Sequence, residues 1–268
     1  MRANTKGLAV STLCWVVLIA PAYPVQLAAS MVASPSTPTL ADANDTENLI
    51  HTASGGELRR YSAGTGFFIA PDQVLTAYHV INHGCKALTV GNNREGVRTL
   101  ATLAAGDRAV DLAVLSTDTM NENWARFQSA VSTSTGEHLA VIGYPEHGRV
   151  VLQAELNPVS AKPSDLVTDA RLYPFAGSVR PGDSGGPVLD ESGTIVGIAV
   201  QKINTVYMYR QTGKVVDNIG FAISNYAVFD FLRANKVAFQ TAALGENMSL
   251  AQILQEAHGF VRQISCWK

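Results

Sequence analysis

The segment with the clearest chemistry spans residues 180–189 and reads RPGDSGGPVL. A nucleophilic serine must project from a tight turn while nearby backbone N–H groups converge on the oxyanion that forms when it attacks a carbonyl. Glycines permit the backbone dihedrals that such a turn needs. Ser184 is therefore the candidate nucleophile, and the N–H groups of Gly182 and Ser184 are the candidate oxyanion-hole donors. Taken alone, the segment is also compatible with a surface loop rich in glycine and serine.

A candidate base lies in residues 64–81 (GTGFFIAPDQVLTAYHVI). This stretch predicts a strand, a Pro-Asp turn, a second strand and then His79 at the start of a short helix. A neutral imidazole can accept the proton of a serine hydroxyl and return it to the leaving amine. His79 is therefore the predicted general base, although a single histidine is more often packed or exposed without any such function.

A candidate orienting acid is Asp111, within the apolar run AVDLAVL. Burying a carboxylate in an apolar strand costs free energy unless a partner compensates it. A histidine N–H would do so, and it would also fix the imidazole tautomer and stabilise the imidazolium. Without His79 and Ser184, Asp111 would be interpreted as an acid at a strand edge or turn.

Metal chemistry is an alternative for the same region, because His79 and His83 are four residues apart and Cys85 is close by. Such a cluster has the ligand types of a zinc site. The HExxH pattern is missing, however, and His79 has a better-explained function as a base. The sequence predicts no metal and no organic cofactor.

The elements that must position these residues are mostly short strands. The chain has 268 residues, of which 47% are hydrophobic, 16% are charged and 22 are glycine. From residue 61 onward, short apolar runs are broken by Gly, Pro, Asn or Asp, a pattern typical of a β-sandwich or a pair of barrels. Two helices are predicted near the end, over residues 225–235 and 248–258. The net charge of -2 argues against nucleic acid as a partner.

The first 29 residues predict a cleaved export signal. Arg2 and Lys6 precede an apolar run over residues 8–20, and small residues follow. That run is shorter than the about 20 residues that span a bilayer, so a signal is favoured over an uncleaved anchor. The mature protein is predicted to be periplasmic or secreted and to have no stable membrane span. Residues 30–56 predict a flexible linker or pro-segment. In an oxidising compartment, Cys85 and Cys266 would either pair or remain as buried thiols.

Together, the three candidate segments resemble the trypsin-like serine proteases, specifically the bacterial HtrA-type branch, over residues 64–234. The order His, Asp, Ser separates this class from the subtilisins and the α/β-hydrolases, and an esterase of the latter fold would also need a GxSxG elbow. Further matching stretches are VIGYP (141–145), VTDA (167–170), GFAIS (220–224) and FDFLRAN (229–235). The resemblance implies an all-β protease domain of two six-stranded antiparallel barrels over residues 57–238, followed by a C-terminal helical extension over residues 239–268.

The resemblance also implies a serine endopeptidase that works through an acyl-enzyme on protein or peptide substrates. It places the S1 pocket at Ser178, Val200 and Gly220. Because no aspartate falls at the base of that pocket, a small or medium apolar P1 residue is expected. Two alternatives stay open: a peptide-binding or chaperone-like protein without turnover, and a zymogen that needs N-terminal trimming. The sequence predicts no oligomeric state.

Three departures from the HtrA pattern stand out. Asp183 precedes the serine where HtrA proteases usually carry asparagine, and in the secreted digestive members this acid pairs with a newly released amino terminus. Arg59-Arg60 is a possible cut site for such trimming. Tyr78 stands where many relatives carry alanine, and the PDZ domain that normally follows is not predicted.

Overall fold

The computed structural model describes residues 48–51, 55–92, 97–129, 134–146, 153–162, 169–177, 179–200 and 218–268. Two compact units divide the chain, residues 1–38 and 39–268, and every described residue belongs to the second. The predicted export signal lies outside the described residues. Within the described ranges, no helix has the length and apolar character needed to cross a membrane.

The first barrel is closed by six antiparallel strands. Their order is β2-β15-β4-β5-β6-β3, and a further pairing between β3 and β2 completes the ring. The strands are β2 (Glu57–Ala70), β3 (Gln73–Ala77), β4 (Ala87–Asn92), β5 (Val97–Asp107), β6 (Leu112–Thr117) and β15 (Val261–Trp267). A short strand, β1 (Leu49–His51), pairs with β2 outside the ring, within the segment that the sequence assigned to a linker.

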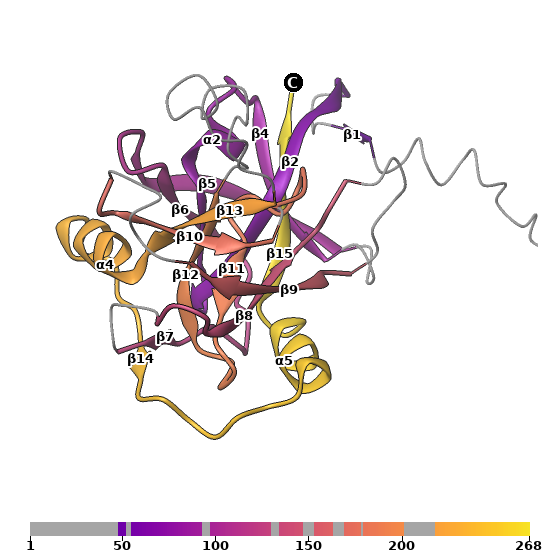
Figure 1. Cartoon of the computed structure of the whole chain (residues 1–268). Helices are drawn as coiled ribbons and strands as arrows, with labels where there is room; N and C mark the ends of the chain where they lie inside the picture. The colour runs from indigo at the N-terminus through magenta and orange to yellow at the C-terminus, as the bar shows by residue number, and fades with distance from the viewer. Residues whose placement is uncertain are drawn as a thin grey trace, which may run out of the picture. The chain divides into compact units, whose positions relative to one another are not determined.

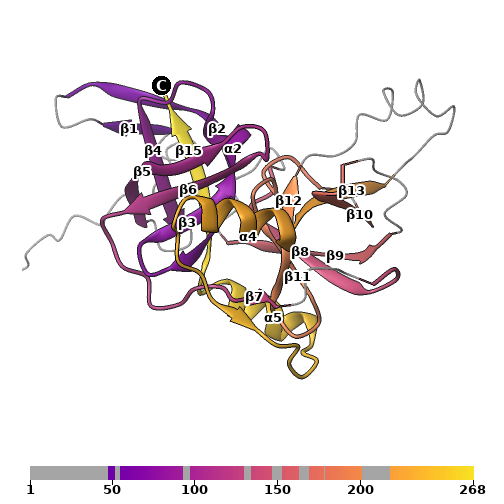
Figure 2. The same cartoon turned by 90° about the vertical axis from the view of Figure 1, so that its left-hand side faces the viewer.

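The second barrel closes in the same way, in the order β11-β8-β9-β10-β13-β12, with β11 paired to β12. Its strands are β8 (His138–Gly143), β9 (Glu155–Ala161), β10 (Leu172–Ala176), β11 (Pro187–Leu189), β12 (Ile195–Val200) and β13 (Ile219–Ser224). Two-residue strands, β7 (Phe127–Gln128) and β14 (Thr241–Ala242), extend the sheet beyond β12. The predicted fold of two six-stranded antiparallel barrels is confirmed, and Figure 2 separates the strands of the two.

The strands nearest the site are buried along nearly their whole length. In β2 the run from Gly64 to Ile69 is buried throughout, as is the whole of β12, and β6 has a single residue that is not buried. A strand that is covered on both faces, by the barrel interior and by other parts of the protein, does not alternate apolar and polar residues as a half-exposed strand does. This explains why the sequence shows short continuous apolar runs around the catalytic candidates.

In the described residues, three helices lie outside the barrels: α2 (Tyr78–Ile81), α4 (Asn225–Ala234) and α5 (Leu250–Ala257). They agree with the predicted helix start at His79 and with both predicted C-terminal helices (Figure 1). Ser249 caps α5 as its sequence indicates, in a capping box with Gln252.

The segment 239–268 differs from the expected helical extension because it also carries β14 and β15. Strand β15 inserts between β2 and β4, with Ile264 opposite both Gly64 and Val90. The disulfide between Cys85 and Cys266 fastens this strand, with 5.3 Å between the two Cα atoms. The C-terminal strand is thus part of the first barrel, which a pattern of seven residues cannot reveal when its partners are far away in sequence.

Candidate active site

Two glycines shape the loop around Ser184, which runs from β10 into β11. Gly182 has φ 91° and Gly185 has φ 85°, in the region that side-chain-bearing residues avoid. Space is equally restrictive: a Cβ on Gly182 would lie 2.2 Å from the Tyr144 carbonyl oxygen, and one on Gly185 would lie 2.3 Å from that of Thr65. Only glycine at both positions lets the loop pack between β2 and the end of β8.

The peptide planes beside Ser184 are held by their carbonyl groups. The Pro181 carbonyl accepts a hydrogen bond from the Glu146 N–H at 2.7 Å, and the Asp183 carbonyl accepts one from Gly186 at 2.9 Å. In a trans peptide the C=O and N–H groups point in opposite directions, so these bonds turn the N–H groups of Gly182 and Ser184 the other way. Within the described part of the chain, neither N–H donates to a protein acceptor. Such a pair is suited to receive an oxyanion.

Thr65 of the first barrel clamps this loop, although the sequence analysis did not single it out. Its side chain is fully buried. The hydroxyl donates to the Gly182 carbonyl at 2.6 Å and accepts from the Tyr144 N–H at 2.9 Å. Its backbone N–H donates to the Ser184 carbonyl at 2.9 Å. The available signal was a hydroxyl residue between two glycines in an otherwise apolar strand.

His79 and Asp111 are joined by two hydrogen bonds. The ring Nδ1 lies 2.7 Å from Asp111 Oδ2, and the His79 backbone N–H donates to Oδ1 at 2.8 Å. The Tyr78 N–H also donates to the Asp111 carbonyl at 3.0 Å. A carboxylate on Nδ1 fixes the tautomer in which Nε2 can accept a proton.

The position of Asp111 differs from the sequence prediction. The residue does not lie inside an apolar strand; it lies in the turn between β5 and β6, with φ 61° and a side chain that is 34% exposed. Partial exposure removes most of the burial cost that motivated the prediction. The hydrogen bonds to α2 hold the carboxylate in place despite a backbone conformation unfavourable for aspartate.

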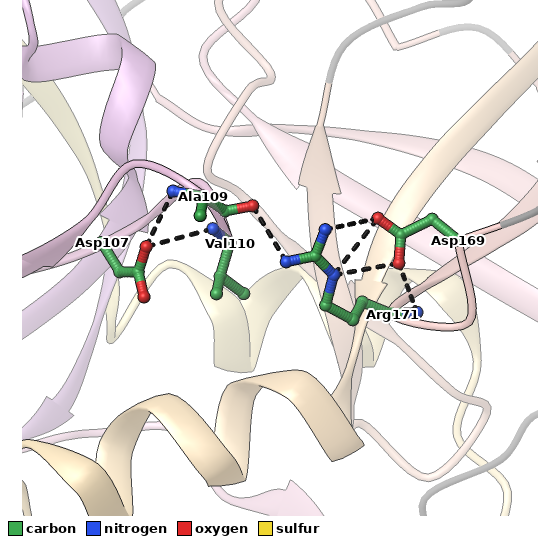
Figure 3. Close-up of polar contacts among 5 residues, drawn as sticks. All are labelled: Asp107, Ala109, Val110, Asp169 and Arg171. Atoms are coloured by element: carbon green, nitrogen blue, oxygen red, sulfur yellow. Dashed lines mark hydrogen bonds and ion pairs between the residues drawn. The ribbon is translucent and has the colours of Figure 1, made fainter.

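A group of polar contacts fixes the turn that carries Asp111 (Figure 3). Asp107 Oδ1 accepts hydrogen bonds from the N–H groups of Ala109 and Val110, at 2.7 and 3.3 Å. Arg171, just before β10 in the second barrel, donates from Nη1 to the Ala109 carbonyl at 3.0 Å. Its Nε and Nη2 bind Asp169, and this hydrogen bonding lowers the pKa of the Asp169 carboxyl. The second barrel therefore holds a turn of the first.

The loop of Ser184 and helix α2 meet on the same stretch of β2. A Cβ on Gly64 would lie 2.6 Å from a methyl group of Val80 and 3.0 Å from the Ser184 carbonyl oxygen. One on Gly185 would lie 2.7 Å from the Ala77 nitrogen, at the start of α2. The fold thus brings all three predicted residues to one region. The hydrogen bonds of His79 among the described residues go to Asp111, and none joins it to Ser184; such contacts often tighten only when substrate binds.

Asp183, next to the nucleophile, is completely buried. Its Oδ2 accepts hydrogen bonds from the Arg180 backbone N–H at 3.1 Å and from Nε at 2.8 Å, and its Oδ1 lies 3.3 Å from Nη2. Burial raises the pKa of the Asp183 carboxyl, while the hydrogen bonds and charge of Arg180 oppose the rise. The partner of this acid is therefore an arginine three residues earlier, where the family resemblance implied an amino terminus.

Two of the three predicted S1 residues, Val200 and Gly220, lie in the described part of the chain. Ser178 lies outside the described residues. Val200 borders a pocket of about 280 Å³ beside Asp111, together with Leu172 and Phe221. Gly220 faces Phe175 across the β10–β13 pair, where a Cβ would lie 2.3 Å from the ring. The P1 preference remains a prediction from sequence.

Over the same described ranges, no cluster of three or more His, Cys, Asp or Glu side chains is arranged to hold a metal ion. Cys85, the third member of the zinc cluster considered from sequence, has its sulfur in the disulfide. His83 lies against the ring of Tyr61, with 5.3 Å between ring centroids.

The fold and this arrangement of residues define a trypsin-like serine peptidase. The family described as "Trypsin-like peptidase domain" matches residues 64–198, half of the chain, and the protein belongs to this family.

Within the family, its relatives include HtrA-type proteases. It is 32% identical over 158 residues to the "Serine protease Do-like HtrA" of Bacillus subtilis, covering 56% of this chain and 33% of that protein. It is 33% identical over 177 residues to the "Probable periplasmic serine endoprotease DegP-like" of Rhizobium meliloti, covering 63% of this chain and 32% of that one. The chain thus spans about a third of the length of these curated relatives.

A similar fold is found in the crystal structure of the Rv3671c protease of Mycobacterium tuberculosis in its inactive form. The two structures have a TM-score of 0.52 and 26% sequence identity, and the match covers 66% of this chain and 86% of that one.

Proposed function

We propose that this protein is a serine endopeptidase that hydrolyses peptide bonds with Ser184 as nucleophile, His79 as general base and Asp111 as the orienting acid. The observation that carries the proposal is the pair of hydrogen bonds between His79 and Asp111, made beside the loop of Ser184. Membership of the trypsin-like peptidase family supports the same assignment.

In the proposed reaction, the Ser184 hydroxyl attacks the substrate carbonyl carbon while His79 Nε2 accepts its proton. The carbonyl oxygen becomes an oxyanion and receives hydrogen bonds from the N–H groups of Gly182 and Ser184. When this intermediate collapses, the C–N bond breaks and the imidazolium donates its proton to the leaving amine. Water, deprotonated by His79, then hydrolyses the acyl-enzyme and regenerates Ser184. Every step uses groups of this chain, the substrate and water.

We also propose that the protein is exported and acts on proteins or peptides in the periplasm or outside the cell. The disulfide between Cys85 and Cys266 supports this location, because such bonds persist in oxidising compartments. The Rhizobium relative, which is named a probable periplasmic serine endoprotease, supports this location as well.

The test is labelling of the purified protein with a fluorophosphonate probe, with cleavage of casein measured in parallel. We expect labelling at Ser184 alone, lost in Ser184→Ala and strongly reduced in His79→Ala. Ser249→Ala is the matched control, because Ser249 caps α5 and has no part in the site; it should label and cleave like the wild type.

One outcome would contradict the proposal. A folded wild-type protein that binds casein but neither labels nor cleaves, before or after N-terminal trimming, would favour peptide binding without turnover. Labelling that appears only after N-terminal trimming would keep the proposed triad and identify the untrimmed chain as a zymogen.

A further inference from the structure

The buried carboxylate of Asp183 needs a cation, since an unpaired charge in the interior is strongly unfavourable. The side chain is fully enclosed and precedes the nucleophile directly. Two charged groups act on it, Arg180 of the same loop and Glu155 of β9, whereas β2 and β8 contribute the uncharged Thr65 and Gly143. The group that supplies the positive charge therefore holds in place a peptide group that borders the candidate oxyanion hole.

Arg180 supplies that charge from inside the loop. Its backbone N–H and its guanidinium both bind the Asp183 carboxylate, and the Asp183 N–H returns a hydrogen bond to the Arg180 carbonyl at 3.0 Å. The guanidinium also bonds Glu155 Oε2 through Nη1 at 3.1 Å. These contacts close a four-residue turn that contains Gly182. The ion pair and the candidate oxyanion-hole donor therefore lie in the same turn.

An amino terminus created at Arg59-Arg60 is poorly placed to compete with this arginine. Both residues lie inside β2, with Arg59 paired to Leu49 of β1 and Arg60 opposite Trp267 of β15. Thr65, the β2 residue at the level of the Ser184 loop, is five residues further along, roughly 16 Å at the rise of a strand. To reach Asp183, the new terminus would have to leave its pairing with β15.

We propose that Arg180 is a positioning residue that replaces the amino-terminal ammonium as the partner of Asp183, so that the oxyanion hole is formed without any new chain terminus. This inference rests on the proposed protease function, because the effect of Arg180 is measured through the activity of Ser184. It deepens that function by making activity independent of N-terminal trimming.

Burial and Arg180 shift the pKa of Asp183 in opposite directions, so the proposed role of Arg180 has a characteristic pH dependence. A buried carboxyl with a raised pKa holds its proton more tightly in the folded chain than in the unfolded chain, so its contribution to stability falls as the pH rises above about 4. Removing the guanidinium removes the opposing effect and raises the pKa of Asp183 further. The loop should then be disturbed most at high pH, where the carboxylate is ionised and unpaired.

The experiment compares the full chain with Arg180→Gln, Arg180→Lys, Asp183→Asn and the double variant Arg180→Gln/Asp183→Asn. Steady-state kinetics and fluorophosphonate labelling are measured at about pH 5.5 and about pH 8.5, because a carboxyl with a raised pKa carries its proton more often at the lower pH. We expect Arg180→Gln to lower kcat by about 100-fold at the higher pH, similar to the loss of an oxyanion-hole donor, with a smaller change in KM. Relative to the wild type, it should be less impaired at the lower pH.

The remaining variants separate positioning from general stabilisation. Arg180→Lys keeps the charge and should retain more activity than Arg180→Gln. The double variant should recover part of the lost kcat, because the neutral amide leaves no buried charge without a partner. Arg233→Gln is the matched control: this exposed arginine of α4 lies over the rings of Phe229 and Phe239, and its loss should leave kcat unchanged.

Two results would overturn the inference while leaving the protease function intact. One is a wild-type chain that labels at Ser184 only after its N-terminal segment is cut. The other is an Arg180→Gln variant with wild-type kcat at both pH values. A wild-type protein that is never labelled, trimmed or untrimmed, would instead overturn the proposed function and this inference with it.

Discussion

The two barrels each bring one aspartate to the site, and these two carboxylates are held in opposite ways. Asp111 of the first barrel is one-third exposed, sits in a turn and binds the ring of His79. Asp183 of the second barrel is fully buried and binds Arg180 within its own loop. Asp111 therefore meets a partner whose charge changes during the proposed reaction, whereas Asp183 meets a permanent cation that offsets the cost of its burial. Exposure thus distinguishes the proposed orienting acid from the proposed structural acid.

Each barrel also forms hydrogen bonds to the loop or turn that carries a candidate catalytic residue of the other barrel. Thr65 of the first barrel bonds the Gly182 and Ser184 carbonyls of the second. Arg171 of the second barrel bonds the Ala109 carbonyl in the turn that carries Asp111 of the first. The first connection is buried and the second is largely exposed, so their loss should have unequal consequences.

Asp111→Asn is the most direct test of the difference between the two acids. We expect kcat to fall about 10⁴-fold, because the amide favours the wrong imidazole tautomer. The melting temperature should change little, since the side chain is partly exposed. Kinetics and thermal melts check this, with Asp118→Asn, an exposed acid just after β6, as the control. A variant with near wild-type kcat would remove Asp111 from the triad.

The two barrels also differ in how they close, because the ring of the first includes β15 from the C-terminal segment, whereas β14 extends the sheet of the second outside its ring. Replacing Cys85 and Cys266 by serine should lower the free energy of unfolding by about 5 kcal/mol in the chain-entropy picture, because the bridge spans 181 residues of sequence. Denaturant melts with and without dithiothreitol measure the effect. Reductant should reproduce the loss in the wild type and leave the double serine variant unchanged; a reductant-insensitive wild type would contradict the prediction.

The buried connection between the barrels is tested by Thr65→Val. The Tyr144 N–H and Gly182 carbonyl would lose a buried partner, at a cost of about 1–3 kcal/mol each. We expect kcat to fall by about 10- to 100-fold as the nucleophile loop loosens, and Thr65→Ser, which keeps the hydroxyl, to retain most of the activity. Equal losses in the serine and valine variants would show that packing of the methyl group matters as much as the hydrogen bonds.

The exposed connection should matter least. Arg171→Gln removes the bond to the Ala109 carbonyl, and we expect a decrease of a few-fold in kcat at low salt. High salt should shrink the difference between variant and wild type, because exposed ion pairs are screened. Arg108→Gln, an exposed arginine in the same turn, is the control. A loss as large as that of Thr65→Val would mean that the two connections are equivalent.

The sequence singled out the catalytic candidates because their evidence is local. A serine among glycines, a histidine at the start of a helix and an acid beside an apolar run could each be recognised from a few residues, and their order indicated the fold. The environment of Asp111 was predicted wrongly, since a run of apolar letters does not reveal that the acid lies in the turn just before the strand. Thr65 and Arg171 were missed because Gly182 and Ala109, which they bind, become their neighbours only on folding. Arg180 was missed for another reason: it is three residues from Asp183, but the sequence does not show that this carboxylate is buried and needs a cation.

By itself, the sequence determined the strand-rich class, the two C-terminal helices and the identity of the proposed triad. Only the tertiary structure decided that β15 completes the first barrel, that Cys85 pairs with Cys266 and that Asp183 binds Arg180. The physical reason is the range of the interactions. Turn geometry, helix capping and apolar pattern depend on neighbours along the chain, whereas barrel closure, disulfide pairing and the compensation of a buried charge depend on which groups the fold brings together.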